Sequence, residues 1–313
     1  MIVYRELSSL ARDLGFEAKT LYAVSNSLEK HYRQVCLPKK DGGVRTLSVP
    51  DPLLKAIQRR ITQVLLVHMP ISPYATAYRY GGNTCRNAAP HVGQPVVLKL
   101  DIQHFFDSIL YSSVKDRAFP PNIYTEPLRV LLTMLCYHGQ SLPQGAPSSP
   151  AITNILLSDF DQEVGAWCAG RQIRYTRYCD DMTFSGQFTP QDVIAFVQDR
   201  LKPLGLFLNG KKTQVLSSGQ RQVVTGLVVN EKLGVPAHDL RALRQEIYYC
   251  RKYGVSSHMA RLGISEPEEH YLMRLLGKVN YVLQVTPNKR EFQQARAWLM
   301  DVLAQDKKSL EIN

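Results

Sequence analysis

Two adjacent aspartates near the middle of the chain constrain its fold more than any other feature. Asp180 and Asp181 interrupt the run 173–185, which is otherwise rich in Tyr, Thr and Phe. The flanking segments 173–178 and 182–185 are predicted to be short strands, which places both carboxylates at a hairpin tip. Two adjacent negative charges contribute nothing to a core. The tip is therefore either a solvated turn or a site where a hard divalent cation compensates the charge. The dipeptide alone favours the turn.

A third carboxylate ends a predicted buried strand earlier in the chain. Residues 96–100 are Val-Val-Leu-Lys-Leu, and Asp101 follows them. A carboxylate at this position is unfavourable unless it is paired or bound to a metal, and the strand by itself leaves these two interpretations even. Between the acidic stretches, residues 142–150 contain three prolines and a glycine. This composition predicts a rigid loop that leads into a helix at 151–164.

The order of these features is more informative than any one of them. Three carboxylates that converge from two strands can hold two magnesium ions about 4 Å apart. Such a pair activates a hydroxyl nucleophile and stabilises a leaving pyrophosphate during in-line displacement. The combination therefore favours the metal over the solvated turn.

The charge balance favours a polyanionic partner. The chain of 313 residues has 38 Lys and Arg against 27 Asp and Glu, which gives a net charge of +11. Nucleic acid is the usual partner of such a chain, and an anionic membrane surface is the alternative. The six cysteines form no Cys-x-x-Cys pair, so we expect no zinc site and a reducing, cytoplasmic location. We expect neither a signal peptide nor a membrane span.

The remaining pattern alternates helices and strands. Asp-Gly-Gly at 41–43 predicts a hairpin over 35–50, Asp51 and Pro52 predict the start of a helix, and the Pro- and Gly-rich stretch 70–95 is predicted to be loop. Further strands are expected at 206–209 and 223–229. Further helices are expected at 5–30 with a break at Gly15, and at 125–136, 189–202, 240–252, 267–284 and 288–305.

With these motifs in this order, the chain resembles a reverse transcriptase, and more narrowly the retron class from bacteria. Residues 178–181 resemble the Tyr-x-Asp-Asp signature, with Cys179 where Ala is common. Residues 100–106 resemble the first metal-binding motif, and 142–150 the template and nucleotide loop. The Asn-Ala-Ala-Pro-His sequence at 87–91 is similar to the Asn-Ala-x-x-His element of the retron insertion, and 224–226 to the Val-Thr-Gly element. The resemblance extends from about residue 30 to 230.

The resemblance implies an α+β fold, a right-hand polymerase with fingers, palm and helical thumb. The palm would be an antiparallel sheet packed on helices. Residues 1–95 would form the N-terminal helices and fingers, with a retron-type insertion near 80–95. Residues 96–235 would form the palm, and 236–313 a thumb that binds template RNA.

The resemblance also implies roles for individual residues. Asp101 and Asp180 would bind two Mg²⁺ ions, or Mn²⁺ as a substitute, with support from Asp181 and the Ile102 carbonyl. Phe106 would exclude a ribose 2′-hydroxyl, and Lys212 or Lys211 would protonate the pyrophosphate. Lys39 and Arg45 would bind the triphosphate. Gln144 and Gly145 would contact the incoming nucleotide and the template. The residues implied to contact nucleic acid are Asn87, His91, Tyr178, Val224, Thr225 and Gly226.

A basic and aromatic face on the predicted helix 240–252 is a further candidate for nucleic-acid binding. Its members lie beside the apolar face of the same helix and are Arg241, Arg244, Tyr248 and Arg251. A helix of this kind suits a nucleic-acid backbone, and a merely solvated face is equally consistent with the pattern.

The implied function is RNA-templated DNA synthesis from dNTPs. A retron enzyme uses a cognate structured RNA as template and primes from an internal guanosine 2′-hydroxyl. Its product is a branched RNA–DNA hybrid, called multicopy single-stranded DNA, and its role is anti-phage defence alongside an effector protein. One alternative is a group II intron-like or other bacterial reverse transcriptase, although the intron proteins carry a maturase region for which we expect no room here. Another is a non-catalytic RNA-binding module on a polymerase palm, against which the intact carboxylates argue.

Overall fold

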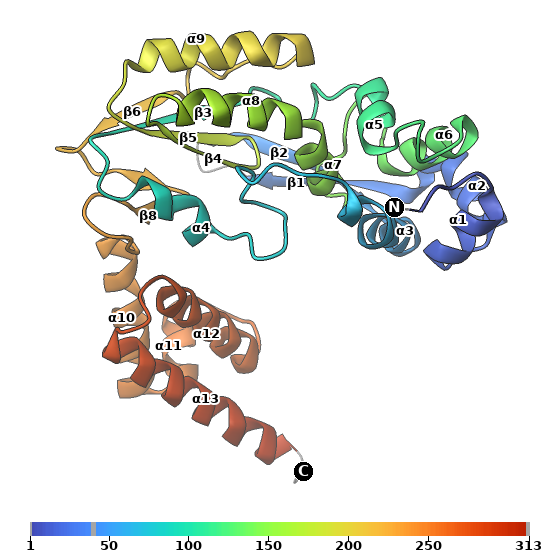
Figure 1. Ribbon diagram of the computed structural model, residues 1–313. Coiled ribbons are helices and arrows are strands. Elements are labelled where there is room, and N and C mark those ends of the chain that lie inside the picture. The colour runs from blue at the N-terminus through green and yellow to red at the C-terminus, as the bar shows by residue number, and fades with distance from the viewer. Residues whose placement is uncertain (1, 39–41, 311–313) are drawn as a thin grey trace. The chain divides into compact units, whose positions relative to one another are not determined.

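Four strands form one antiparallel sheet in the computed structural model, which describes residues 2–38 and 42–310 (Figure 1). In spatial order they are β4 (Arg174–Tyr178), β5 (Asp181–Gly186), β3 (Val96–Asp101) and β6 (Gln214–Ser217). The side chains of Leu98, Met182 and Phe184 are fully buried in one apolar cluster with Val193 and Val197. The last two belong to α9 (Pro190–Leu201), which lies with α8 (Ser158–Ala169) along this side of the sheet (Figure 1).

The predicted hairpin over 35–50 is confirmed. Strands β1 (Tyr32–Pro38) and β2 (Val44–Pro50) pair antiparallel, and Lys39 in the turn lies outside the described residues. The predicted helix start at Asp51 is also confirmed, because its carboxylate accepts a hydrogen bond of 2.8 Å from the backbone N–H of Leu54. This cap begins α3 (Pro52–Val64). The amide of Ser48 in β2 donates to the Gln144 carbonyl at 2.8 Å, which joins the hairpin to the 142–150 loop.

Helices account for the rest of this first unit, which comprises Met1–Pro90 and Pro95–Ser217. The predicted helix 5–30 is divided at Gly15, where φ is 75°, as the break predicted. The predicted helix 151–164 is likewise divided, near Leu157. Apart from the short segment 84–91, described below, the elements not yet given are α1 (Leu7–Leu14), α2 (Ala18–Ser25), α5 (Tyr111–Ala118), α6 (Glu126–Cys136) and α7 (Ser149–Leu156), with 3₁₀ turns at Leu28–His31, Leu66–His68 and Lys202–Leu204.

Two sequence-based predictions of local structure were wrong. The stretch 70–95 is not all loop, because Asn83 caps the helix α4 (Thr84–Ala88) and a 3₁₀ turn follows at Ala89–His91. The high Pro and Gly content of this stretch indicated loop, so the cap at Asn83 was not predicted. The predicted strand 206–209 forms a single bridge, between Leu208 and Ile102, because it runs beyond the end of β3. The strand that pairs with β3 on the side away from β5 is β6, which begins after the following turn.

The second unit comprises His91–Gln94 and Ser218–Asn313. Its strands β7 (Val223–Val224) and β8 (Leu227–Val228) form a small hairpin, where a strand at 223–229 was predicted. Thr225 and Gly226 form the turn with φ of 45° and 81°, and a positive φ is unusual for a β-branched residue.

Four helices complete the second unit. The three predicted helices are confirmed as α10 (Ala237–Tyr253), α12 (Glu268–Val285) and α13 (Arg290–Leu310), and α11 (Val255–Arg261) was not predicted. They share a core that includes Leu243, Ile247, Tyr271 and Leu299. None of the described helices combines the length and apolarity needed to span a membrane. The boundaries of fingers, palm and thumb stay a prediction.

Candidate active site

Strand register brings the predicted carboxylates to one end of the sheet. Asp101 at the end of β3 is the partner of Asp181 at the start of β5, and Asp181 is also the partner of Tyr178 in β4. Cys179 and Asp180 therefore form a two-residue hairpin loop. The predicted hairpin is confirmed, but only Asp180 lies in its loop, because Asp181 is already paired in β5. The Ile102 amide donates to the Asp180 carbonyl at 3.3 Å, which ties this loop to the end of β3.

The hairpin loop contains an unusual backbone conformation. Cys179 has φ of 62°, in the left-handed region that favours glycine. A non-glycine residue held in this region is found mainly where the surrounding structure enforces it, and often at functional sites. Burial raises the pKa of the Cys179 thiol to about 12, so the thiol stays protonated and is a poor nucleophile.

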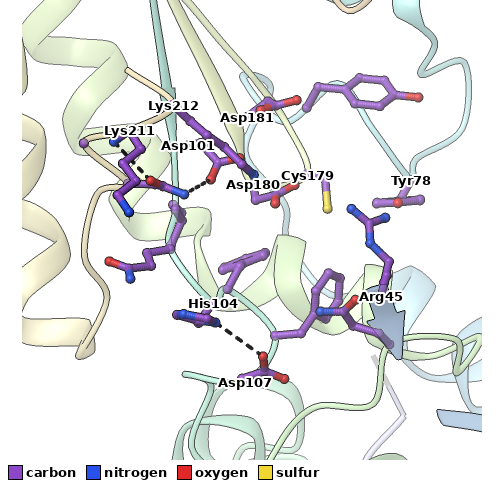
Figure 2. A pocket seen from close by; sticks show the side chains of 18 residues that line it. Arg45, Tyr78, Asp101, His104, Asp107, Cys179, Asp180, Asp181, Lys211 and Lys212 are labelled. Carbon is purple, nitrogen blue, oxygen red and sulfur yellow. Dashed lines mark hydrogen bonds and ion pairs between the residues drawn. The ribbon is translucent and has the colours of Figure 1, made fainter. Parts of the chain in front are cut away.

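Asp101 is almost fully buried and has two side-chain partners, both from the turn after the Leu208 bridge. Its carboxylate accepts hydrogen bonds from Lys212 Nζ at 2.8 Å and from Asn209 Nδ2 at 3.4 Å (Figure 2). The hydrogen bond to Asp101 raises the pKa of Lys212 more than desolvation lowers it, so the ammonium is protonated at neutral pH. Within the described residues the Lys211 side chain makes no hydrogen bond to Asp101, and the Lys211 backbone amide donates to Asn209 Oδ1 at 3.2 Å.

Asp181 carries uncompensated negative charge. It lies at the surface, yet surrounding atoms remove part of its hydration, and this raises the pKa of its carboxyl. The charges of Asp180 and Asp101 raise that pKa further, whereas Lys99 and Lys212 oppose the effect. The negative charge of the three carboxylates therefore exceeds what the nearby lysines neutralise, and a cation would relieve it.

The donor set fits a hard divalent cation, although the side chains do not yet enclose one. Within the described part of the chain, no three His, Cys, Asp or Glu side chains converge closely enough to hold a metal ion. The strand register nevertheless places Asp101 opposite Asp181, so rotation of the side chains can bring the carboxylates together. Mg²⁺ needs only one or two protein carboxylates when substrate phosphates supply further oxygens. Asp101, Asp180 and the carbonyl of Ile102 are the candidate ligands, with Asp181 in support.

A cavity of about 1030 Å³ opens over the carboxylates. Figure 2 shows Arg45 and Tyr78 on the side of Asp180, and Lys211 and Lys212 on the side of Asp101. The predicted residues that line the cavity are Arg45, Asp101, Ile102, Phe106, Gln144, Tyr178, Asp180, Asp181 and Lys212. The structure therefore brings the predicted nucleotide and metal residues together, apart from Gly145. Lys39 lies outside the described residues.

Contacts at Leu142 and Gly145 fix the position of the 142–150 loop beside this cavity. The Leu142 amide donates to the Phe106 carbonyl at 3.1 Å, and the Phe106 ring packs edge-on against Phe105. Gly145 has φ of 116°, and a Cβ atom there would lie 2.9 Å from the Ser48 carbonyl oxygen. Only glycine fits so close to the backbone of β2, so Gly145 shapes the loop rather than lining the cavity.

The structure contradicts the prediction that the side chains of Asn87 and His91 contact nucleic acid directly. Both side chains are buried, with 1% and 0% of their surface exposed. The Asn87 Oδ1 atom accepts a hydrogen bond of 2.6 Å from the Thr76 hydroxyl. A buried and bonded side chain cannot face a polymer in solvent, so these residues support the surrounding backbone. The Val224 side chain is also buried, which leaves the backbone and the turn for contact, where Thr225 is half-buried and Gly226 is exposed.

The predicted basic face of α10 has two different kinds of member. Arg244 forms two hydrogen bonds with the Glu291 carboxylate, at 2.8 and 2.7 Å. Arg251 donates to the Gln294 carbonyl at 3.0 Å and lies over the Trp298 ring. Both arginines therefore attach α13 to α10. Arg241 and Tyr248 are exposed.

Two further residues of the site were missed from the sequence. Tyr78, with φ of 54°, lines the cavity beside Cys179, and burial raises the pKa of its hydroxyl. Asn209 supports Asp101 through the contact given above, and its amide also donates to the Asp101 carbonyl at 2.8 Å. The signal for Asn209 was its position before Gly210 in a turn, whereas Tyr78 lies in a stretch that was predicted only as loop.

Comparisons with known proteins identify the family of this chain. The profile of the reverse transcriptase (RNA-dependent DNA polymerase) family matches residues 37–240. The retron Mx65 reverse transcriptase of Myxococcus xanthus is 33% identical over 285 residues, which cover 83% of this chain and 66% of that protein. The retron Ec86 reverse transcriptase of Escherichia coli is 30% identical over 264 residues, which cover 82% of each protein.

Solved structures give a more distant likeness. The foamy viral protease-reverse transcriptase in complex with double-stranded DNA has a TM-score of 0.48 and 15% identity, over 97% of this chain and 45% of that chain. This likeness adds nothing to the sequence comparisons. The family match over residues 37–240 and the Ec86 relative, however, leave no ambiguity. The chain belongs to the reverse transcriptase family and, within it, to the retron reverse transcriptases, which are RNA-directed DNA polymerases.

Proposed function

We propose that this chain copies a cognate structured RNA into DNA with two Mg²⁺ ions and primes from an internal guanosine 2′-hydroxyl of that RNA. The product would be a branched RNA–DNA hybrid, the multicopy single-stranded DNA of retrons. The observation that carries the catalytic part of this proposal is the register of Asp101 with Asp181 beside the Asp180 loop. The cytoplasm is the proposed location.

The metal ligands would be Asp101, Asp180 and the Ile102 carbonyl, with Mn²⁺ as a substitute for Mg²⁺. Reverse transcriptases use divalent metal ions, which activate the attacking hydroxyl and stabilise the leaving pyrophosphate. Lys212 would hold a proton at its Nζ atom for that pyrophosphate, and Asp101 orients the ammonium at 2.8 Å. Arg45 and Lys39 would bind the triphosphate, and Gln144 would contact the nucleotide and template.

The ring of Phe106 would select the sugar of the incoming nucleotide. Replacing it in Phe106→Ala is expected to lower the ratio of kcat/KM for dNTPs to kcat/KM for rNTPs by at least about tenfold, because the ribose 2′-hydroxyl no longer meets the ring. Single-nucleotide incorporation with paired dNTP and rNTP series measures this ratio. Phe106→Tyr keeps the ring and is the matched control. A ratio that is unchanged in Phe106→Ala removes the gate role.

The two kinds of arginine on α10 provide an internally controlled test of template binding. Arg241→Ala is expected to flatten the log–log salt dependence of binding by up to about 0.9 for a duplex and about 0.7 for a single strand, the slopes expected for one phosphate contact. Arg244→Ala should instead lower thermal stability, because its partner is Glu291. Titrations at four salt concentrations measure the slope. An unchanged slope in Arg241→Ala means that this side chain is only solvated.

The retron part of the proposal has its own experiment. RNA transcribed from the DNA immediately upstream of the gene is incubated with the protein, dNTPs and Mg²⁺, and the product is analysed for DNA covalently attached to RNA. We expect attachment at one internal guanosine, and 2′-deoxyguanosine at that position should eliminate it. DNA that starts only from RNA 3′ ends would instead indicate another class of bacterial reverse transcriptase.

The remaining parts of the proposal are those that the resemblance to retron enzymes implies. Residues 1–95, 96–235 and 236–313 would act as fingers, palm and thumb. The thumb and the turn at Thr225 and Gly226 would contact the cognate RNA. The biological role would be anti-phage defence together with an effector protein. Loss of protection in cells that carry the Asp180→Asn variant would support that role, and full protection would contradict it.

A further inference from the structure

A fully buried arginine lies two residues before the catalytic loop. Arg177 in β4 and Asp161 in α8 both have side chains with 0% of their surface exposed. The guanidinium donates to both carboxylate oxygens, with Arg177 Nη2 to Asp161 Oδ2 at 2.6 Å and Nε to Oδ1 at 2.8 Å. Burial lowers the pKa of Arg177, but the charge and hydrogen bonds of Asp161, with smaller contributions from Tyr175 and Cys179, together outweigh this effect and raise that pKa. The guanidinium therefore remains charged inside the protein.

The same guanidinium holds the backbone of the catalytic loop. Its Nη1 atom donates to the carbonyl of Cys179 at 2.8 Å. That carbonyl directly precedes Asp180, and Cys179 is the residue with φ of 62°. The three nitrogens of one planar group thus bridge helix α8 to the peptide bond that connects Cys179 with Asp180. Lysine has no such rigid fork and could not make these contacts together.

The backbone of Arg177 is fixed from the opposite direction. Its carbonyl accepts from the Thr76 amide at 2.8 Å, and its amide donates to the Tyr74 carbonyl at 2.8 Å. The Thr76 hydroxyl in turn donates to Asn87. The segment 74–76 therefore lies along β4 and holds Arg177 between itself and α8, so the position of the guanidinium is determined on both sides.

Stability alone is a weak reason for such a pair. Well-packed apolar side chains often replace a buried ion pair without loss of stability, because burial of two charges removes their hydration. An apolar side chain cannot, however, donate to the Cys179 carbonyl. The contact that distinguishes an arginine here is the one to the catalytic loop.

We infer that Arg177, fixed by Asp161, is a positioning residue that holds the left-handed conformation of Cys179 and so directs the Asp180 carboxylate toward the metal site. This inference rests on the proposed metal-dependent polymerase function. Arg177 would act through the peptide bond before Asp180 and would not touch substrate or metal itself.

The test removes the charge pair without leaving a buried charge. In the double variant Arg177→Met with Asp161→Asn, methionine fills the space of the arginine stem. Asparagine keeps an acceptor for the Tyr175 hydroxyl, which donates to Asp161 at 2.7 Å. We expect a half-saturating Mg²⁺ concentration about 10- to 100-fold higher, as for lost outer support of metal ligands. We also expect kcat to fall by up to about 10²-fold, with template–primer affinity unchanged.

Arg129 offers a matched control. It is also buried, donates through Nε to the Phe119 carbonyl at 2.8 Å, and pairs with Glu126 and Asp116. Arg129→Met with Glu126→Gln should lower thermal stability and leave the half-saturating Mg²⁺ concentration as in the wild type. A purely structural role of Arg177 predicts the same result for its own double variant, since the folded fraction would bind Mg²⁺ normally.

A second variant keeps the inference testable if the first does not fold. Arg177→Lys retains the charge opposite Asp161 but cannot also hold Cys179, so its half-saturating Mg²⁺ concentration should rise as well. A normal Mg²⁺ dependence in either folded variant overturns the inference, and so does loss of cooperative unfolding in both, which would assign Arg177 to folding. A wild-type protein that makes no DNA contradicts the proposed function instead.

Discussion

Replacement of Asp180 by asparagine is expected to reduce DNA synthesis by on the order of 10³-fold or more. The ligand charge that attracts the metal is lost, and with it several kcal/mol of transition-state stabilisation, where each 1.36 kcal/mol is tenfold in rate. Asparagine keeps the size of the side chain, so the Cys179–Asp180 loop and RNA binding should survive. Single-turnover incorporation and RNA-binding titrations measure the two properties separately. The double variant Asp180→Asn with Asp181→Asn should abolish synthesis.

Other carboxylates in the cavity provide the controls for this prediction. Asp181→Asn alone should have a smaller effect, because Asp181 is assigned a supporting role. Asp107 lines the same cavity but faces His104 at 3.9 Å rather than the three carboxylates, so Asp107→Asn should leave the half-saturating Mg²⁺ concentration unchanged. DNA synthesis retained in the double variant would exclude these aspartates as metal ligands.

Lys212→Ala is expected to lower kcat by about 10²- to 10⁴-fold, the contribution of a positioned general acid. The sequence left Lys211 and Lys212 as alternatives. In the structure Lys212 reaches Asp101 at 2.8 Å and has a raised pKa, which keeps a proton available at neutral pH. Lys211→Ala is therefore the matched control and should retain most of the activity. Pre-steady-state incorporation measures the chemical step without product release.

The contact with Asp101 requires one further variant. Lys212→Arg keeps a cation beside Asp101, but arginine does not release its proton under these conditions. Loss of rate in both Lys212→Arg and Lys212→Ala supports proton transfer. Full activity of Lys212→Arg would mean that the lysine serves only as a counter-charge, and equal losses in Lys211→Ala and Lys212→Ala would remove the distinction between the two.

Local patterns were sufficient for much of this fold. The Tyr-, Thr- and Phe-rich run and its Asp-Asp interruption predicted β4, β5 and the hairpin between them, and Gly15 predicted the break between α1 and α2. The carboxylates of the site were also predicted, because a charged residue that ends a buried strand or occupies a hairpin tip is visible without tertiary contacts. Composition alone could not predict α4, because its cap at Asn83 lies in a stretch rich in Pro and Gly.

Long-range pairing could not be predicted from these patterns. Arg177 appeared as one residue of a strand and Asp161 as one residue of a helix, and only the packing of α8 against β4 reveals that they form a pair. Likewise, helical spacing showed that Arg244 and Arg251 share a face of α10, but not that α13 covers part of it. Burial of Asn87 and His91 depends on the same kind of tertiary contact.

Primer extension on poly(rA) with oligo(dT), dTTP and Mg²⁺ tests the central claim most directly, because it requires only an RNA template, a DNA primer and the carboxylate site. We expect the wild-type protein to extend the primer in a Mg²⁺-dependent manner and the Asp180→Asn variant to bind the same template–primer without extending it. A wild-type protein that binds the template–primer tightly but adds no dTMP at any Mg²⁺ or Mn²⁺ concentration would contradict the assignment of a polymerase active site to Asp101, Asp180 and Asp181.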